Sequence, residues 1–437
     1  MLANAVEVKI TPDFPALMAG FPSPLDRFAT GVHDDLWAHC FYMKTNGGEE
    51  FAIVTMDLLY YSKMRVKTMR AQIEARTGIP ADNISIYCTH THSGPISIAY
   101  RQNFDERNML YPDYLEKIEI DVANALAKAK KEAFPAKIGS GKGYCGKEQG
   151  VGGNRRDPNG PCDPAVWVTA IRDLDDNVRG AIVRYSLHPT FRGADNTLIS
   201  CDYPHYLYET IKSAHPGAVV GFQNGTSGDQ SSRHFRTGTT FEEAERVGST
   251  IAKEALRVID EIKYNENPVI KFLKTEYTPE LRKILPYEEA RAAAEKAAAD
   301  LKNARETGVS EAECRTLECT TFGANMMLRY AEIGADVIYS FNGEHPFEVS
   351  LFIIDDLRML GNPAEMFVKY MLKMYEMSPF EKTYITCCAN GRGKGYICPP
   401  EAHAEGGYEA LGSIYTENNG DMILDVMMGL LEKSKNI

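Results

Sequence analysis

Two histidines stand two residues apart in the stretch CTHTHSGP, which runs from Cys88 to Pro95. The preceding NISIY alternates polar and apolar residues as a half-buried strand does, so the stretch is expected at a strand end. Alternate side chains of an extended chain point to the same side, and His90 and His92 could therefore converge on one point. Converging imidazole nitrogens can bind a metal ion. A hydrogen-bonded turn is the alternative interpretation.

Three further polar segments follow apolar runs. His188 ends GAIVRYSLH, Ser231 lies in NGTSGDQSSR after the strand-like VVGF, and Glu365 follows a Gly-Asn-Pro turn in LRMLGNPAEMF. Loops at the carboxyl ends of strands are where α/β proteins bind their ligands. Each segment also has an ordinary structural explanation: a hydrogen-bonded histidine, a polar turn, or a carboxylate that begins a helix and favours its dipole.

The elements that would position these residues alternate along the chain. FAIVTMD predicts a strand, SKMRVKTMRAQIEARTG a helix closed by Gly78, and NISIYC a second strand, which together form a β-α-β unit. A long helix is predicted at YPDYLEKIEIDVANALAKAKKEA. Further strands are predicted at VWVTAIRDL, GAIVRYSLH, AVVGFQN, DVIYSFNG, VSLFIIDDLRMLG and KTYITCCA. The alternation predicts an α/β fold.

One segment has a different composition. Residues 285–308 are rich in Ala, Glu and Lys, and Ser310 with Glu313 forms a capping-box signal for a second helix. We expect a helical hairpin within residues 279–325, on the surface and without catalytic residues.

Composition restricts the function. The 437 residues carry 48 basic and 60 acidic side chains, a net charge of -12, and show no block of Lys or Arg. Nucleic acid and anionic membranes are therefore not expected as partners, and no apolar run is long enough to insert stably into a membrane. The N-terminal residues lack a basic, apolar leader, and the ten cysteines form no C-x-x-C pair. We therefore expect a cytoplasmic protein with reduced thiols.

Taken together and in this order, the segments resemble the catalytic domain of the neutral/alkaline (non-lysosomal) ceramidases, which are zinc-dependent amide hydrolases. Two more blocks contribute: Asn154-Arg155 in VGGNRRDP, and Tyr396 and Tyr408, twelve residues apart in GYICPPEAHAEGGYE. The resemblance implies layered, mixed β-sheets covered by helices in a single large catalytic domain, residues 1–437, with the hairpin as an insertion. Carried over residue by residue, it implies zinc ligation by His90, His188, Glu365 and Tyr396, and catalytic roles for His92, Arg155, Ser231 and Tyr408.

The function implied by the resemblance is hydrolysis of a C–N amide bond by metal-activated water, with one zinc ion per chain. A zinc-dependent esterase and a non-catalytic binding protein of the same fold are the alternatives. The chain departs from the family at Ser231-Ser232-Arg233, where the known ceramidases have Ser-Pro-Asn, and no C-terminal β-sandwich domain follows the last block. These departures favour a small, soluble N-acyl substrate over long-chain ceramide, and a role in sphingolipid metabolism is correspondingly doubtful.

Overall fold

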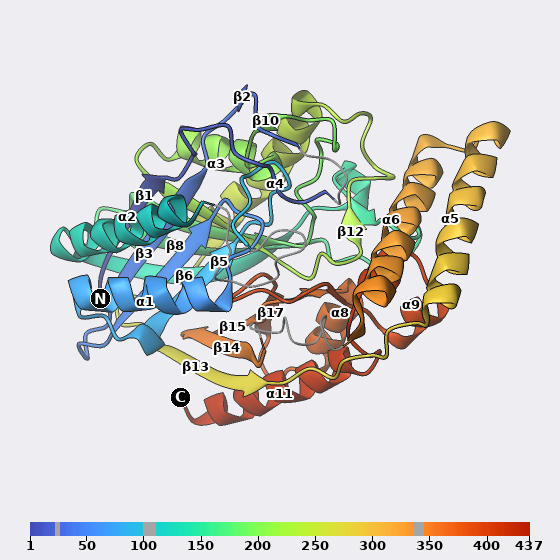
Figure 1. Ribbon diagram of the computed structural model, residues 1–437. Coiled ribbons are helices and arrows are strands. Elements are labelled where there is room, and N and C mark those ends of the chain that lie inside the picture. The colour runs from blue at the N-terminus through green and yellow to red at the C-terminus, as the bar shows by residue number, and fades with distance from the viewer. Residues whose placement is uncertain (22–26, 99–110, 336–344) are drawn as a thin grey trace.

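The computed structural model describes residues 1–21, 27–98, 111–335 and 345–437 (Figure 1). The strands of its largest sheet are β1 (Leu2–Lys9), β3 (Trp37–Lys44), β4 (Glu50–Met56), β5 (Ile84–Cys88), β6 (Phe134–Tyr144), β8 (Ala165–Asp173), β9 (Val178–Tyr185) and β11 (Val219–Asn224). They lie in the order β11-β9-β8-β6-β1-β3-β4-β5. The pairs β11–β9 and β4–β5 are parallel and the other pairs are antiparallel, so the sheet is mixed.

A second mixed sheet has the order β13-β14-β15-β17. Its strands are β13 (Ile270–Tyr277), β14 (Phe347–Ile354), β15 (Leu357–Gly361) and β17 (Lys382–Thr386). Three short strand pairs lie outside both sheets: β2 (Gly31–Val32) with β10 (Leu198–Ile199), β7 (Gly153–Asn154) with β12 (Gln230–Ser231), and β16 (Glu365–Met366) with β18 (Tyr396–Ile397).

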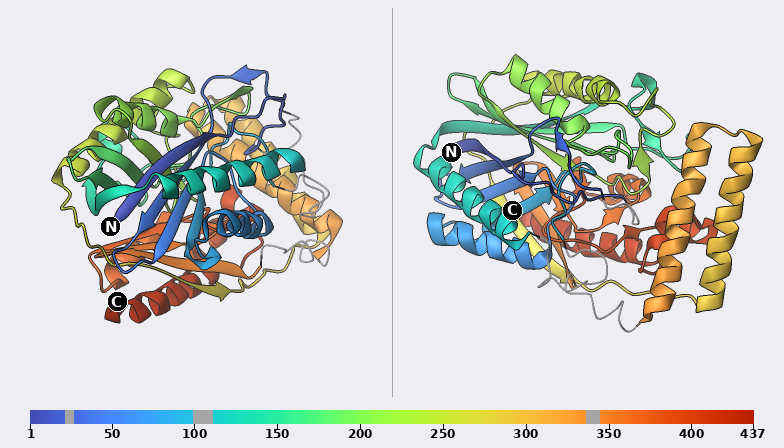
Figure 2. Two further views of the ribbon diagram at one scale, coloured as in Figure 1. Left: turned by 90° about the vertical axis from the view of Figure 1, so that its left-hand side faces the viewer. Right: turned by 45° about the horizontal axis from the view of Figure 1, so that its top comes forward.

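The large sheet folds over where β1 meets β6, two strands that are joined by only two residue pairs. The bend brings β9 and β11 against β1, β3 and β4, and the second sheet closes the remaining side (Figure 2). Phe41, Ile171 and Ile354, one from each part, line the same interior space. The core therefore lies between three layers of strands. Strands that are covered on both faces have continuous apolar sequences, and these runs were the basis for predicting them.

Helices cover the outside. α2 (Pro112–Lys131) packs on β1 and β3 with α1 (Lys63–Thr77) beside it, and α4 (Phe241–Glu261) packs on β6 and β8 with α3 (Tyr203–Ala214) beside it. α8 (Val368–Met377) and α11 (Asn419–Lys433) cover the second sheet. The α1 signals work as predicted: the Ser62 hydroxyl accepts from the Arg65 N–H, and Gly78 ends the helix at φ 72°. The predicted fold class, layered α/β with mixed sheets, is confirmed.

The predicted hairpin is also present, although its bounds are wrong. α5 (Tyr287–Thr307) and α6 (Glu311–Ile333) pack side by side and project from the sheets (Figures 1 and 2). Its first helix starts after Pro286, and α6 continues to Ile333 because its face toward the body of the protein stays apolar. The capping box of Ser310 and Glu313 forms as expected. α6 contacts α10 (Tyr408–Gly412), and α9 (Pro400–Glu405) precedes it.

One strand prediction is wrong. VSLFIIDDLRMLG forms two strands, β14 and β15, rather than one, because Asp355 turns the chain at φ 52°, a left-handed conformation that Asp tolerates. The predicted strand DVIYSFNG lies outside the described residues. All ten cysteines are free. None of the described helices has both the length and the apolar character needed to cross a bilayer.

Candidate active site

Three buried histidines form the centre of the site. Ring nitrogens of His90, His92 and His188 all lie within 4.8 Å of one another. The convergence of His90 and His92 has a different cause from the expected one. Strand β5 ends at Cys88 and His90 adopts a left-handed conformation (φ 69°), so the two rings meet through a turn and not through the alternation of an extended strand. Such a conformation in a residue other than glycine marks a position that the surrounding structure constrains.

Hydrogen bonds fix which nitrogens face the centre. His90 Nδ1 lies 3.0 Å from the Leu59 carbonyl oxygen, and His188 Nδ1 lies 2.6 Å from that of Ser227. A carbonyl can only accept, so both Nδ1 atoms carry the proton, and in the neutral imidazole each Nε2 then presents a lone pair. Those Nε2 atoms lie 3.2 Å and 2.9 Å from the same oxygen, Oε2 of Glu365.

This centre therefore has acceptors without donors. Two Nε2 lone pairs and a carboxylate oxygen converge with no proton between them, and both ring nitrogens of His92 lack a hydrogen-bond partner among the described residues. Burial lowers the pKa of His188 to about 4. Two imidazoles and one carboxylate are a donor set that suits a divalent cation such as zinc.

Short strand pairing positions Glu365 beside Tyr396. β16 and β18 run parallel with these two residues in register, and Tyr396 lies with its ring centroid 6.4 Å from that of His188. Glu365 Oε1 accepts a hydrogen bond from the Tyr60 hydroxyl, a contact that the sequence did not suggest. Tyr60 follows β4, whose end lies beside the end of β5 because the two strands are parallel. That shared sheet edge is the signal that could have identified it.

Arg155 lies next to the two tyrosines. Its guanidinium carbon is 5.5 Å from the Tyr396 ring centroid and 5.9 Å from that of Tyr408. Its Nε donates to Glu409 Oε1 at 2.7 Å, and Arg156 Nη1 donates to Glu409 Oε2 at 3.0 Å. Glu409 is buried, and although burial raises the pKa of its carboxyl, the two arginines lower it overall. Sequence reasoning missed Glu409, which directly follows Tyr408.

A second strand pair brings Ser231 to the same place. β12 and β7 are antiparallel, with Ser231 opposite Gly153. Asp229 holds the loop by accepting from the Asn154 side chain at 2.8 Å and from the Val368 N–H at 2.9 Å. The Ser231 hydroxyl accepts from the Arg233 N–H at 3.2 Å, so its own proton remains available. The loop thus places the Ser231 hydroxyl in the wall of the cavity that Arg155 and His92 also line.

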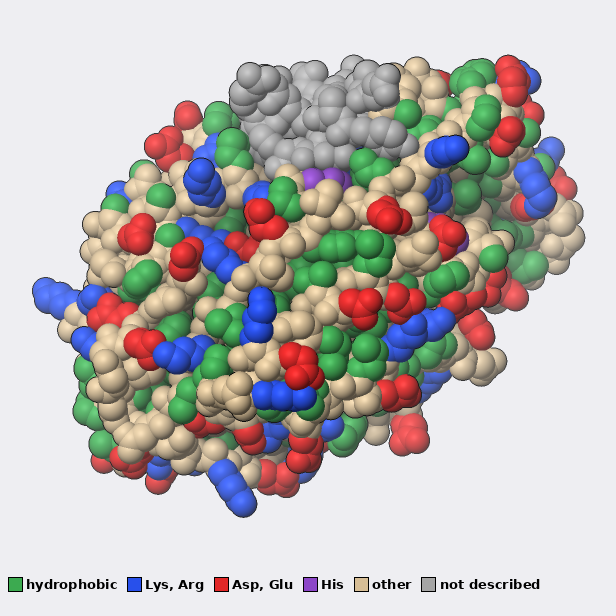
Figure 3. Space-filling view, turned by 90° about the horizontal axis from the view of Figure 1, so that it is seen from below, with side chains coloured by type: hydrophobic (Ala, Val, Ile, Leu, Met, Phe, Trp, Pro, Cys, Tyr) green, Lys and Arg blue, Asp and Glu red, His purple; other side chains and the backbone are tan. Residues whose placement is uncertain are grey.

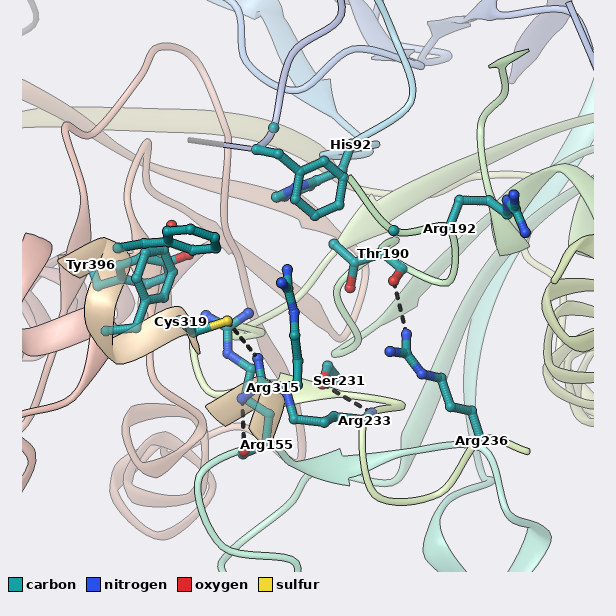
Figure 4. Close-up of a pocket in the computed structure, with 15 residues that line it drawn as sticks. His92, Arg155, Thr190, Arg192, Ser231, Arg233, Arg236, Arg315, Cys319 and Tyr396 are labelled. Atoms are coloured by element: carbon teal, nitrogen blue, oxygen red, sulfur yellow. Dashed lines mark hydrogen bonds between the residues drawn. The ribbon is translucent and has the colours of Figure 1, made fainter. Parts of the chain in front are cut away.

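A cavity of about 60 Å³ opens next to this cluster (Figure 4). His92, Ser231, Arg155, Tyr396 and Tyr408 line it, whereas His90, His188 and Glu365 lie behind them. The sequence-predicted residues therefore all lie at one site. The expectation for the hairpin needs correction, because Arg315, Cys319 and Phe322 of α6 form part of the cavity wall. α6 comes this close because Gly323 has no side chain: a Cβ there would lie 2.7 Å from the Tyr408 carbonyl oxygen.

The fold and the site together define a layered α/β protein with a buried histidine–carboxylate centre of the kind that metal-dependent hydrolases use. No family model matches the sequence. Among curated proteins, the chain is 24% identical over 230 residues to the neutral ceramidase of Pseudomonas aeruginosa and 25% identical over 252 residues to neutral ceramidase A of Dictyostelium discoideum. Each alignment covers 49% of this chain but only 34% and 33% of the relatives.

The solved structures give the same relationship at the level of the fold. The crystal structure of the Pseudomonas aeruginosa neutral ceramidase matches 99% of this chain and 74% of its own, with a TM-score of 0.73 at 17% identity. A ceramidase complexed with C2 matches with a TM-score of 0.71, over 99% of this chain and 75% of its own. The chain is related to the neutral ceramidases, as a divergent relative that matches only part of their length.

Proposed function

We propose that the chain is a metal-dependent hydrolase that cleaves the C–N amide bond of an N-acyl substrate. Its relationship to proteins named neutral ceramidases supports this reaction class. The observation that carries the proposal is the convergence of two imidazole lone pairs and a carboxylate oxygen on one buried point, because this arrangement lacks the proton that would stabilise it without a cation.

In this proposal zinc is held by His90, His188 and Glu365, with Tyr396 as an additional ligand, one ion per chain. A phenol binds a metal best when the metal lowers its pKa, which burial and the nearby carboxylate of Glu365 otherwise raise well above the usual range. When bound, zinc supplies a Lewis acid that polarises a carbonyl and lowers the pKa of water.

The remaining residues act on the substrate. Ser231 orients the attacking water or the substrate through its free hydroxyl proton. Arg155 and Tyr408 stabilise the negative charge that develops on the amide oxygen, since both line the cavity next to the centre. His92 passes a proton to the leaving amine, because neither of its ring nitrogens is held by another group.

The test measures metal content and turnover together. Protein purified without chelator is expected to hold about one equivalent of zinc and to release amines from N-acyl amides, and chelation should abolish both. His90→Ala should empty the site, whereas His215→Ala, at the end of α3, should retain the metal. A panel of matched amides and esters then decides the bond: hydrolysis of esters alone would replace the amidase proposal by the esterase, and zinc well below one equivalent would refute the metal assignment.

A further inference from the structure

The outer part of the cavity is rich in arginine. Among the described residues, five arginines line it and no Asp or Glu does. Three of them form what we term the rim: Arg233 and Arg236, from the loop after β12, and Arg315, from α6. Arg155 belongs to the catalytic side, and Arg192 turns away from the others toward the Thr239 carbonyl (Figure 4).

Two rim arginines lack an acidic partner. Arg233 donates to the Arg155 carbonyl at 3.3 Å, to the Thr316 hydroxyl at 3.1 Å and to the Cys319 sulfur at 3.3 Å. Arg236 donates to the Thr190 carbonyl at 3.2 Å. Within the described ranges, no carboxylate oxygen lies within 4.0 Å of either guanidinium, whereas Arg315 pairs with Glu318. In the part of the chain that the structure describes, the rim therefore carries positive charge that no paired carboxylate neutralises.

This arrangement is unusual for the molecule as a whole. The net charge is -12, and on the face that Figure 3 shows, basic and acidic side chains are interspersed. Most of the other described arginines form an ion pair with Asp or Glu, for example Arg70 with Glu348 and Arg184 with Asp163. The charges are also close enough to act on one another: burial lowers the pKa of Arg236, and Arg233 and Arg315 lower it further.

Half-buried cations that repel one another are stabilised by an anion between them. Guanidinium groups bind carboxylate, phosphate and sulfate oxygens through charge-assisted, often paired hydrogen bonds. The neighbouring hydroxyl, sulfur and carbonyl partners fix the Arg233 side chain, so that the site is organised before a ligand enters.

We propose that the cavity takes an N-acyl substrate bearing an oxyanion, whose anionic end binds Arg233 and Arg236 while the amide lies against the histidine–carboxylate centre. This inference rests on the proposed amide hydrolysis and narrows its substrate class. Carboxylate, phosphate and sulfate share the required chemistry, and the substrate panel below separates them. A neutral lipid amide would leave the rim arginines without a partner.

The experiment compares charged substrates with neutral counterparts of the same shape. The pairs are N-acetylglycine with N-acetylglycinamide, and N-acetyl-4-aminobutyrate with its carboxamide; N-acetyl phosphoethanolamine and N-acetyltaurine extend the panel to phosphate and sulfonate. The kcat/KM of at least one anionic compound should exceed that of its neutral counterpart about tenfold or more, the scale of a hydrogen bond to a charged group. Equal kcat/KM for charged and neutral members would overturn the inference.

Variants test whether the rim is responsible. Arg236→Gln should remove about tenfold in kcat/KM for the anionic substrate, mainly through KM, and leave the neutral one unchanged. Arg329→Gln, on the exposed side of α6 where Arg329 pairs with Glu332, is the matched control and should change neither. An equal loss on both substrates in Arg236→Gln would indicate a structural effect and would contradict the inference.

A binding measurement separates failure of the inference from failure of the proposed function. Calorimetric titration of the same anionic and neutral compounds requires no turnover. If no amide is hydrolysed, yet the anions bind to the wild type and only weakly to Arg236→Gln, the anion-binding role of the rim is supported and the proposed reaction is refuted. If amides are hydrolysed and the anions bind no better than their neutral counterparts, the inference fails and the reaction stands.

Discussion

The histidine–carboxylate centre and the arginine rim are built in opposite ways, although only one cavity separates them. In the centre, each side chain comes from a strand end or a short strand pair and faces a partner: Glu365 faces the Nε2 atoms of His90 and His188, and Arg155 pairs with Glu409. In the rim, the side chains come from a loop and a helical hairpin, and two charges are not offset. Under the proposed function, the sheets would position the groups that cleave the bond, while the hairpin and the loop after β12 would select the substrate.

The strongest test of the centre is Glu365→Gln. It removes the carboxylate that faces both Nε2 atoms and accepts from Tyr60. We expect loss of bound zinc and a fall in kcat of roughly 10⁴-fold or more, the scale seen when an essential catalytic group is removed. Elemental analysis and steady-state kinetics measure the two effects. Glu376→Gln, an exposed position on α8, is the control; a variant at Glu365 that keeps full zinc and most of its activity would show that the carboxylate is only structural.

Glu409→Gln tests whether charge compensation is a real property of the centre. It leaves Arg155 buried beside an uncharged partner, which costs about 3 kcal/mol of the free energy of unfolding. Urea denaturation measures the change. Glu405, whose side chain is 66% exposed, is the other acidic partner of Arg156. Glu405→Gln should lower the free energy of unfolding by less than about 1 kcal/mol. Similar losses in the two variants would contradict the distinction between a compensated interior and a solvated surface.

Ser231→Ala is expected to have the next largest effect. The protein should fold and hold zinc normally, while kcat falls by roughly 10²-fold because one positioned hydrogen-bonding group is lost. Ser232→Ala is the neighbouring control, because the Ser232 hydroxyl makes no hydrogen bond within the described structure. Full activity in Ser231→Ala would show that Ser231 has no catalytic role and that the loop only supports the cavity wall.

The smallest effect is expected at the rim arginine that already pairs with an acidic residue. Arg315→Gln should raise KM for an anionic substrate by no more than roughly fivefold, because Glu318 already offsets part of its charge and such pairs contribute at most about 1 kcal/mol. Its effect should be smaller than that of Arg236→Gln in the same assay. If Arg315→Gln had the larger effect, the anion would bind closer to the hairpin than to the loop after β12.

The fold class could be predicted from local signals, whereas the residues of the centre were assigned through the resemblance of several segments to the neutral ceramidases. Buried strands are continuous apolar runs, helix α1 has a capping serine and a terminal glycine, and the centre lies directly after such strands. Tyr60 and Glu409 were missed because no local sequence signal marks them. Tyr60 reaches the site because the end of β4 lies beside the end of β5, and Glu409 binds Arg155, which is 254 residues away in the sequence. The roles assigned to the site residues stay predictions.

The rim could not be predicted for a different reason. Arg233 and Arg315 are brought together by the packing of α6 against the loop after β12, and arginine has no periodicity or spacing that would reveal this contact. The left-handed conformation of His90 was equally hidden, since an alternating pattern before it favoured continued extension. Local sequence reports burial and chain direction, whereas contacts between distant segments follow from the tertiary structure alone.

The order of the site residues along the chain has a consequence for biosynthesis. His90 and His188 leave the ribosome early, but Glu365, Tyr396 and Tyr408 follow only after the hairpin has been made. The β16–β18 pairing that sets Glu365 beside Tyr396 cannot form before both segments are available. During a long part of translation, a nascent chain therefore has the two imidazoles but not the carboxylate. If the chain binds the proposed metal, we expect binding after synthesis, when the last of these segments docks.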